Sequence, residues 1–237
     1  MKGAGMAKGS GAGDLDELFV GPGRRSAAAA GAPKADPGGL SADLNGLVRQ
    51  YEDVGREAER IASGLSDRQF NWRSSSGRWS IAECFGHLNI VGSELLPRID
   101  GAIGQARGHA WYRKGPLRVG FVGRRLIAAA EPPARRKRRA RPDHVAAGDQ
   151  AIDLVLPALL DLNRQLGMRA KAASGLDITR PKVTAFGARV FRPSLYELFL
   201  VLAAHERRHL RQAQAVKDDP GFPRGRAAGP VAPRPPR

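Results

Sequence analysis

Two histidines four residues apart are the side chains in this sequence best suited to do chemistry. They are His205 and His209, in the stretch LAAHERRHLRQA at residues 202–213. Residues four apart on a helix project from one face about one turn from each other, so two neutral imidazoles placed this way can bind one metal ion. The spacing alone does not establish a site, because histidine pairs on helices are often only solvated.

The apolar pattern around the pair predicts that both histidines face the interior. A leucine stripe at helical spacing over residues 195–202 continues into them, and buried imidazoles need polar partners. Arg207 and Arg208, between them, are expected to point to solvent. The predicted partner is His87, at the edge of a second apolar stripe that contains Cys84 and Val91.

Four amphipathic helices are predicted to position these residues. Apolar residues recur three and four apart over about residues 40–63, 81–108, 149–173 and 195–216. Ser80 with Glu83, and Ser194 with Glu197, have the spacing of capping boxes, which fix the starts of the second and fourth helices. The pattern predicts an all-α four-helix bundle.

The connections constrain the order of the helices. About 40 residues join the second and third helices, enough to cross the bundle and allow those two helices to run parallel. At about 1.5 Å per residue, His87 lies roughly 10 Å from the start of its helix, and the His205–His209 pair roughly 13 Å from the end of its own. In an up-down-down-up bundle with level ends, the three histidines meet at one level.

Two stretches resemble the DinB/YfiT-like superfamily: FNWRSSSGRWSIAECFGHLNIVG at 70–92 and SLYELFLVLAAHERRHLRQAQAV at 194–216. The resemblance covers about residues 40–217 and implies an up-down-down-up bundle. It also implies a metal triad of one histidine on the second helix and an H-x-x-x-H pair on the fourth, which are His87, His205 and His209 here. That superfamily includes thiol S-transferases that use bacillithiol or mycothiol, and hydrolases.

Three histidine ligands leave coordination positions open, as in catalytic sites. A divalent zinc, nickel or iron ion is expected. The leading hypothesis is a metal-dependent enzyme that transfers a small-molecule thiol to an electrophile. A metal-dependent hydrolase, a bundle whose metal is only structural, and a non-catalytic basic nucleic-acid-associated bundle remain alternatives.

The positive charge is concentrated in the long connection. The chain has a net charge of +16, and residues 113–141 hold eleven Lys and Arg against one acidic residue. No aromatic residues interleave the run ARRKRRARP at 134–142. That run is therefore predicted to be a solvated loop without a specific nucleic-acid partner.

The other reactive side chains are expected to have structural roles. Cys84, the only cysteine, is expected to fill the core, and the capping box accounts for Glu83. The residues given no role in the site are Trp72, Trp79, Asp161, Asn163, His109 and His144.

The ends of the chain differ in composition from the bundle domain at 39–217. Residues 1–38 and 218–237 are rich in Gly, Ala, Pro and Arg, and are predicted to be disordered. A single cysteine, no apolar leader and no apolar run of 18 residues predict a cytoplasmic protein without a membrane partner. A homodimer is left open.

Overall fold

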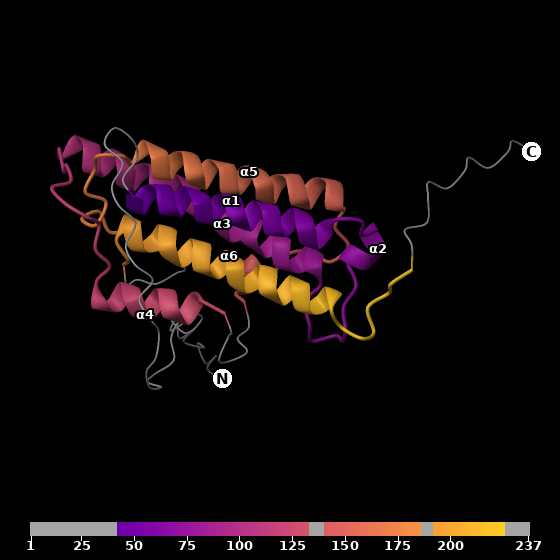
Figure 1. Cartoon of the computed structure of the whole chain (residues 1–237). Helices are drawn as coiled ribbons and strands as arrows, with labels where there is room; N and C mark the ends of the chain where they lie inside the picture. Colours follow the sequence, from indigo (N-terminus) through magenta and orange to yellow (C-terminus); the bar gives the residue numbers. More distant parts are fainter. Residues whose placement is uncertain (1–41, 133–139, 186–191, 226–237) are drawn as a thin grey trace, which may run out of the picture.

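Four long helices lie side by side in the computed structural model, which describes residues 42–132, 140–185 and 192–225 (Figure 1). They are α1 (Ala42–Ala62), α3 (Ile81–Gly108), α5 (Ile152–Ala172) and α6 (Leu195–Lys217). The shorter elements are α2 (Asp67–Phe70), α4 (Phe121–Ala130) and the 3-10 turn η1 (Pro142–His144). The described part of the chain is all-helical, with two isolated β-bridges and no strand, as predicted.

Helices α1 and α6 run in the same direction (Figure 1). The hydroxyl of Tyr51, at the middle of α1, donates to the carbonyl oxygen of Phe199, near the start of α6, over 2.8 Å. At their far ends, the ammonium of Lys217 donates to the carbonyl oxygen of Ile61 over 2.7 Å. Each fully buried aromatic side chain of this contact stabilises the fold by about 1.5–3 kcal/mol through loss of apolar surface.

Helices α3 and α5 run in the direction opposite to α1 and α6 (Figure 1). The side chain of Asn89 donates to the carbonyl oxygen of Val155 over 3.0 Å, near the start of both helices. Further along, Gly92 lets the backbones approach, since a Cβ there would lie 2.3 Å from Cδ2 of Leu162. A larger residue at position 92 would push α3 away from α5.

Capping boxes set the starts of α3 and α6, as the sequence predicts. Ser80 accepts from the N–H of Glu83, whose carboxylate accepts the N–H of Ser80 in return. Ser194 and Glu197 repeat the arrangement at α6. These reciprocal bonds satisfy backbone donors that the first helical turn leaves free.

The long connection contains two elements, α4 and η1, that the sequence pattern did not predict. Gly123, Leu126 and Ala130 of α4 are buried, and α4 packs on α6. The carboxylate of Glu197 holds the start of α4 by accepting the N–H of Gly120 over 2.9 Å. Because α4 has only ten residues and contains Arg124 and Arg125, its apolar periodicity is too short to be recognised within this basic part of the sequence.

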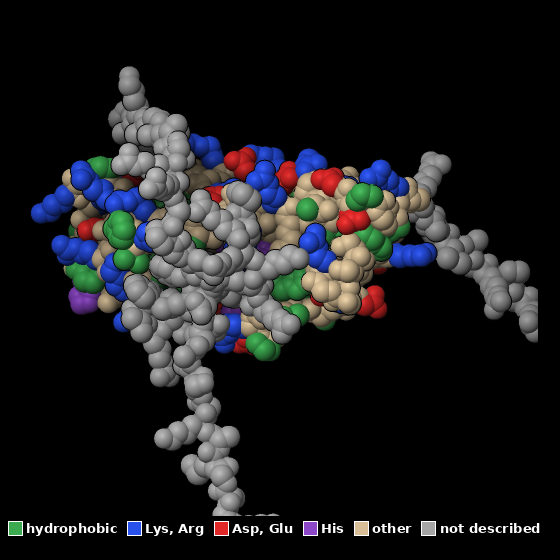
Figure 2. Space-filling model, turned by 90° about the horizontal axis from the view of Figure 1, so that it is seen from below, with side chains coloured by type: hydrophobic (Ala, Val, Ile, Leu, Met, Phe, Trp, Pro, Cys, Tyr) green, Lys and Arg blue, Asp and Glu red, His purple; other side chains and the backbone are tan. Residues whose placement is uncertain are grey.

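Basic side chains in the described part of this connection lie at the surface. Lys114, Arg118, Arg124 and Arg125 are all exposed. Figure 2 shows Lys and Arg side chains gathered at the end of the bundle where α3 terminates. Residues 133–139, which hold most of the run ARRKRRARP, lie outside the described residues.

The chain beyond α6 packs against the bundle up to residue 225. Phe222 is buried, with its ring 5.5 Å from that of Trp72. Gln69 donates to the carbonyl oxygens of Pro223 and Gly225. Residues 218–225 therefore differ from the predicted disordered tail, because one aromatic anchor outweighs the Pro- and Gly-rich composition. The predicted tails at 1–38 and 226–237 lie outside the described residues.

A search of the described helices for a possible membrane span gave no candidate of sufficient length and apolarity.

Candidate metal centre

Helices α3 and α6 bring the three predicted histidines together. One nitrogen from each of His87, His205 and His209 lies within 4.8 Å of the others, a separation that one metal ion can bridge. Nε2 of His87 is 3.1 Å from Nε2 of His205. The ring of His209 lies 4.6 Å from that of His87 and 4.5 Å from that of His205, measured between centroids.

A backbone carbonyl fixes the orientation of the His87 ring. Nδ1 of His87 lies 2.8 Å from the carbonyl oxygen of His144. Because a carbonyl oxygen can only accept, Nδ1 carries the proton, and Nε2 turns its lone pair toward His205 and His209. A histidine that donates one ring nitrogen to a carbonyl while offering the other to the site is typical of metal ligands.

The environment keeps all three imidazoles neutral. Burial lowers the pKa of His87 to about 4, and the positive charge of Arg208 adds to the effect. Burial is also the main cause that holds the pKa values of His205 and His209 well below their ordinary value, with the neighbouring imidazoles and Arg208 contributing. Neutral imidazoles are the form that binds metal ions.

Trp79 covers one side of the cluster. Its ring stacks on that of His209 at 5.6 Å and 23°, and lies 5.0 Å from the ring of His87. The loop between α2 and α3 therefore packs onto the bundle through a side chain that also shields the imidazoles from water. Trp72 packs against Phe222 instead.

His144, to which sequence analysis gave no role, is the principal residue it missed. The side chain is buried in η1, and its Nε2 lies 2.8 Å from a carboxylate oxygen of Glu94 on α3. The other oxygen of Glu94 accepts from Arg98 over 2.7 Å. His144 thus anchors η1 to α3 through its ring and orients His87 through its carbonyl oxygen. No local pattern could reveal this, because His144 and His87 are 57 positions apart.

Glu206 completes an H-E-x-x-H spacing, which sequence analysis considered only as a histidine pair. In enzymes with that motif the carboxylate acts as a base beside the metal. Here Glu206 is buried, one carboxyl oxygen has no hydrogen-bond partner, and burial raises its pKa to about 8. Burial raises the pKa of Tyr51 on α1, and the carboxyl of Glu206 adds to that shift.

The two arginines between the histidines do not simply point to solvent. Arg207 is partly buried, forms an ion pair with Glu131 and donates to Gln50 over 2.7 Å. Arg208 is also partly buried, and its charge lowers the pKa of all three imidazoles. Glu131, the residue after α4, therefore lies against α6, a contact that the sequence pattern did not predict.

The remaining candidates have structural roles. Cys84 is buried, and burial raises the pKa of its thiol, so it is a core residue and not a nucleophile. Glu83 caps α3 and also accepts from Arg73 over 2.7 Å.

Asp161 is paired with Arg164 at the surface. Asn163 was expected at a solvated face but is buried, with its amide donating to the carbonyl of Leu159. His109 is exposed and stacks on Trp111.

The chain was compared with models of known protein families. The model of the DinB superfamily matches residues 50–213, a span that contains α3 and α5 completely, most of α1 and α6, and all three histidines. The chain belongs to the DinB superfamily. No curated protein and no solved structure matches this DinB-superfamily chain.

The cluster fits the metal binding that is general in the DinB superfamily. The donors are three neutral imidazoles, one of them already oriented by a carbonyl. Three histidines are the protein ligand set of catalytic sites, which keep a position for water or substrate. Imidazole donors suit zinc, nickel and iron alike.

Proposed function

We propose that this DinB-superfamily protein is a divalent-metal-dependent enzyme that transfers a low-molecular-weight thiol to an electrophilic small molecule. The observation that carries the proposal is the convergence of three neutral imidazole nitrogens from His87, His205 and His209. The directions of the long helices in Figure 1 support an up-down-down-up bundle as the scaffold.

The surroundings of the histidines favour an anionic nucleophile. When bound, a zinc, nickel or iron ion would supply a Lewis acid that favours thiolate over thiol. The charge of Arg208 adds a positive potential at the three imidazoles. In the transfer, the thiol proton passes to solvent, the sulfur lone pair forms the new bond to the electrophilic carbon, and the leaving group takes the electron pair of the bond that breaks. Trp79 excludes water from one side.

Metal-dependent hydrolysis is the second candidate, favoured by the H-E-x-x-H spacing at 205–209. It has weaker support because burial raises the pKa of Glu206 to about 8, so its carboxyl is mostly protonated at pH 7 and is not ready to accept a proton. A nucleic-acid-associated role would depend on the basic run at 134–142, most of which lies outside the described residues.

The metal requirement can be tested with a matched pair of histidine variants. Purified protein should contain about one divalent ion per chain by elemental analysis, or take one up on titration with zinc, nickel or ferrous iron. His205→Ala should lose it, whereas His109→Ala, at an exposed histidine, should retain it. Absence of metal uptake by the wild type would overturn the proposal.

The reaction can then be tested with a panel of small thiols and an electrophilic acceptor. Thioether formation by the metal-loaded protein, absent in His205→Ala, would support transfer. Release of carboxylate or phosphate from ester substrates without any thiol would favour hydrolysis instead. The proposed partners are thus a thiol and an electrophile, and the proposed compartment is the cytoplasm, where small thiols are kept reduced. A homodimer remains compatible with this function.

A further inference from the structure

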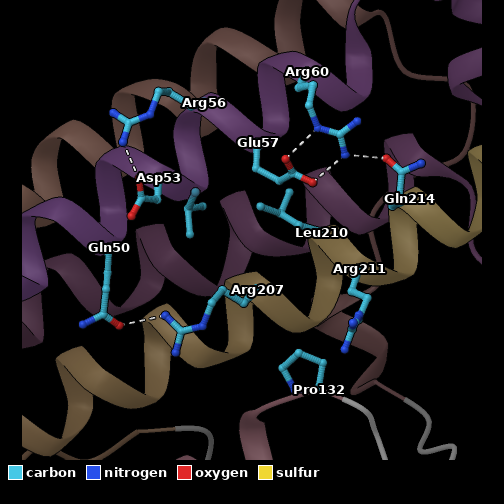
Figure 3. A pocket seen from close by; sticks show the side chains of 11 residues that line it. Gln50, Asp53, Arg56, Glu57, Arg60, Pro132, Arg207, Leu210, Arg211 and Gln214 are labelled. Atoms are coloured by element: carbon cyan, nitrogen blue, oxygen red, sulfur yellow. Dashed lines mark hydrogen bonds and ion pairs between the residues drawn. The ribbon is translucent and has the colours of Figure 1, made fainter. Parts of the chain in front are cut away.

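A cavity of about 630 Å³ lies between α1, α6 and Pro132, which follows α4 (Figure 3). Its volume is in the range of small-molecule sites. Its base is apolar, since Val54 of α1 and Leu210 of α6 line it with buried side chains. Pro132 adds an apolar edge on the opposite side (Figure 3). We call this cavity the α1–α6 groove.

Arginines dominate the polar rim of the α1–α6 groove, four of them against two acidic residues. Arg56 forms an ion pair with Asp53, and Arg60 with Glu57. Both acidic side chains of the rim are therefore already engaged by arginine, as the dashed lines in Figure 3 show. The rim has an excess of positive charge that its own acids do not neutralise.

Arg211 is the arginine available to an incoming anion. Its side chain is exposed, and no described residue forms an ion pair or hydrogen bond with it. In Figure 3 it extends from α6 toward Pro132. Arg207, one turn earlier on the same helix, is held at the wall by Glu131 and Gln50. A guanidinium without a partner beside an apolar surface is suited to a carboxylate, sulfonate or phosphate.

The α1–α6 groove is separate from the histidine cluster. Arg207 and Arg211 each follow a clustered histidine by two residues, which corresponds to about 200° around the helix. Helix α6 thus stands between the groove and the three imidazoles. A ligand in the groove would not contact the metal centre.

We propose that the α1–α6 groove binds an amphipathic organic anion. The anionic group pairs with Arg211, and the apolar body rests on Val54, Leu210 and Pro132. Charge complementarity selects the sign of the ligand, and the apolar base distinguishes it from inorganic phosphate or sulfate.

The probe for this site is 8-anilinonaphthalene-1-sulfonate, whose fluorescence rises on transfer to an apolar surface. Arg211→Gln should raise its Kd about tenfold, the effect of losing one charge-assisted hydrogen bond. Arg68→Gln, at an exposed arginine of α2 that does not line the groove, should change the Kd less than about twofold. Asp53→Asn, which frees Arg56 at an exposed position, should tighten binding.

Two comparisons complete the test. N-phenyl-1-naphthylamine, which lacks the sulfonate, should bind equally to the wild type and Arg211→Gln. Decanoate and decyl phosphate, added as competitors, show whether carboxylate or phosphate is preferred. Equal weakening of the sulfonate probe by Arg211→Gln and Arg68→Gln would overturn the proposal. So would wild-type binding of the neutral probe that is as tight as binding of the sulfonate probe. Metal content and the unfolding midpoint of Arg211→Gln should match the wild type, so failure here is distinct from failure of the metal site.

Discussion

On one face of α6, His205 and His209 lie against α3, while on the opposite face Arg207 and Arg211 border the α1–α6 groove. The first face removes its basic side chains from water, so the imidazoles lose their protons and become metal donors. The second leaves guanidiniums charged at a partly open surface. One helix therefore carries two sites of different chemistry, because burial and not residue type alone decides which basic groups keep their charge.

Substitutions on one face of α6 at a time test most directly whether its two sites are independent. His209→Ala should weaken metal binding by more than about 100-fold, beyond the loss expected for an outer-shell partner, and leave binding of the sulfonate probe unchanged. Arg211→Gln should leave metal affinity unchanged and raise the Kd of the sulfonate probe about tenfold. Calorimetric metal titration and probe fluorescence on both variants measure the separation. If either variant lost both metal binding and probe binding with an unchanged unfolding midpoint, the two faces would not be independent.

Glu206 lies between the two faces and provides the second test. Its pKa is raised to about 8 in the folded protein, so the carboxyl stays protonated there while the unfolded chain ionises above its ordinary value of 4.5. The contribution of Glu206 to the free energy of unfolding should therefore fall as pH rises from about 5 toward 8. Glu206→Gln removes the ionisation and should stabilise the metal-free protein on the order of 2–3 kcal/mol at pH 7.

The measurement is urea unfolding of the metal-free protein between pH 5 and pH 8. The free energies of unfolding of the wild type and Glu206→Gln should differ little at pH 5 and diverge as the pH rises. A constant difference at every pH would assign the effect to packing and not to the charge. Asp161→Asn, at a surface carboxyl paired with Arg164, serves as the control and should show no such divergence.

The smallest expected effect concerns the residues that orient the histidine face. His144→Ala removes the contact to Glu94 that anchors η1, and should lower metal affinity about tenfold by loosening the carbonyl that orients His87. Glu94→Gln keeps an oxygen that can accept from His144, and should retain most of the affinity. If His144→Ala lowered the unfolding midpoint but left metal affinity unchanged, His144 would be structural only.

The local sequence determined where the long helices begin and which histidines share a face. Ser80 and Ser194 start α3 and α6 through contacts three residues away, and these are visible in the sequence because capping is local. Helical periodicity likewise placed His205 and His209 together and gave His87 an inward position. The depth of the histidines along their helices gave a triad, and the resemblance to the DinB superfamily added the expectation that this triad holds a metal. The family match supports metal binding in general.

The surroundings of these residues were decided by tertiary structure alone. His144 meets His87 across 57 positions, and Arg207 meets Glu131 across 76. The burial that raises the pKa of Glu206, the docking of Phe222 and the packing of α4 on α6 likewise come from segments that are distant in sequence. Periodicity and capping act within a few residues, whereas desolvation depends on everything packed around a side chain. The sequence could therefore place the three imidazoles on their helices, but only the folded structure made them neutral and left Arg211 without a partner among the described residues.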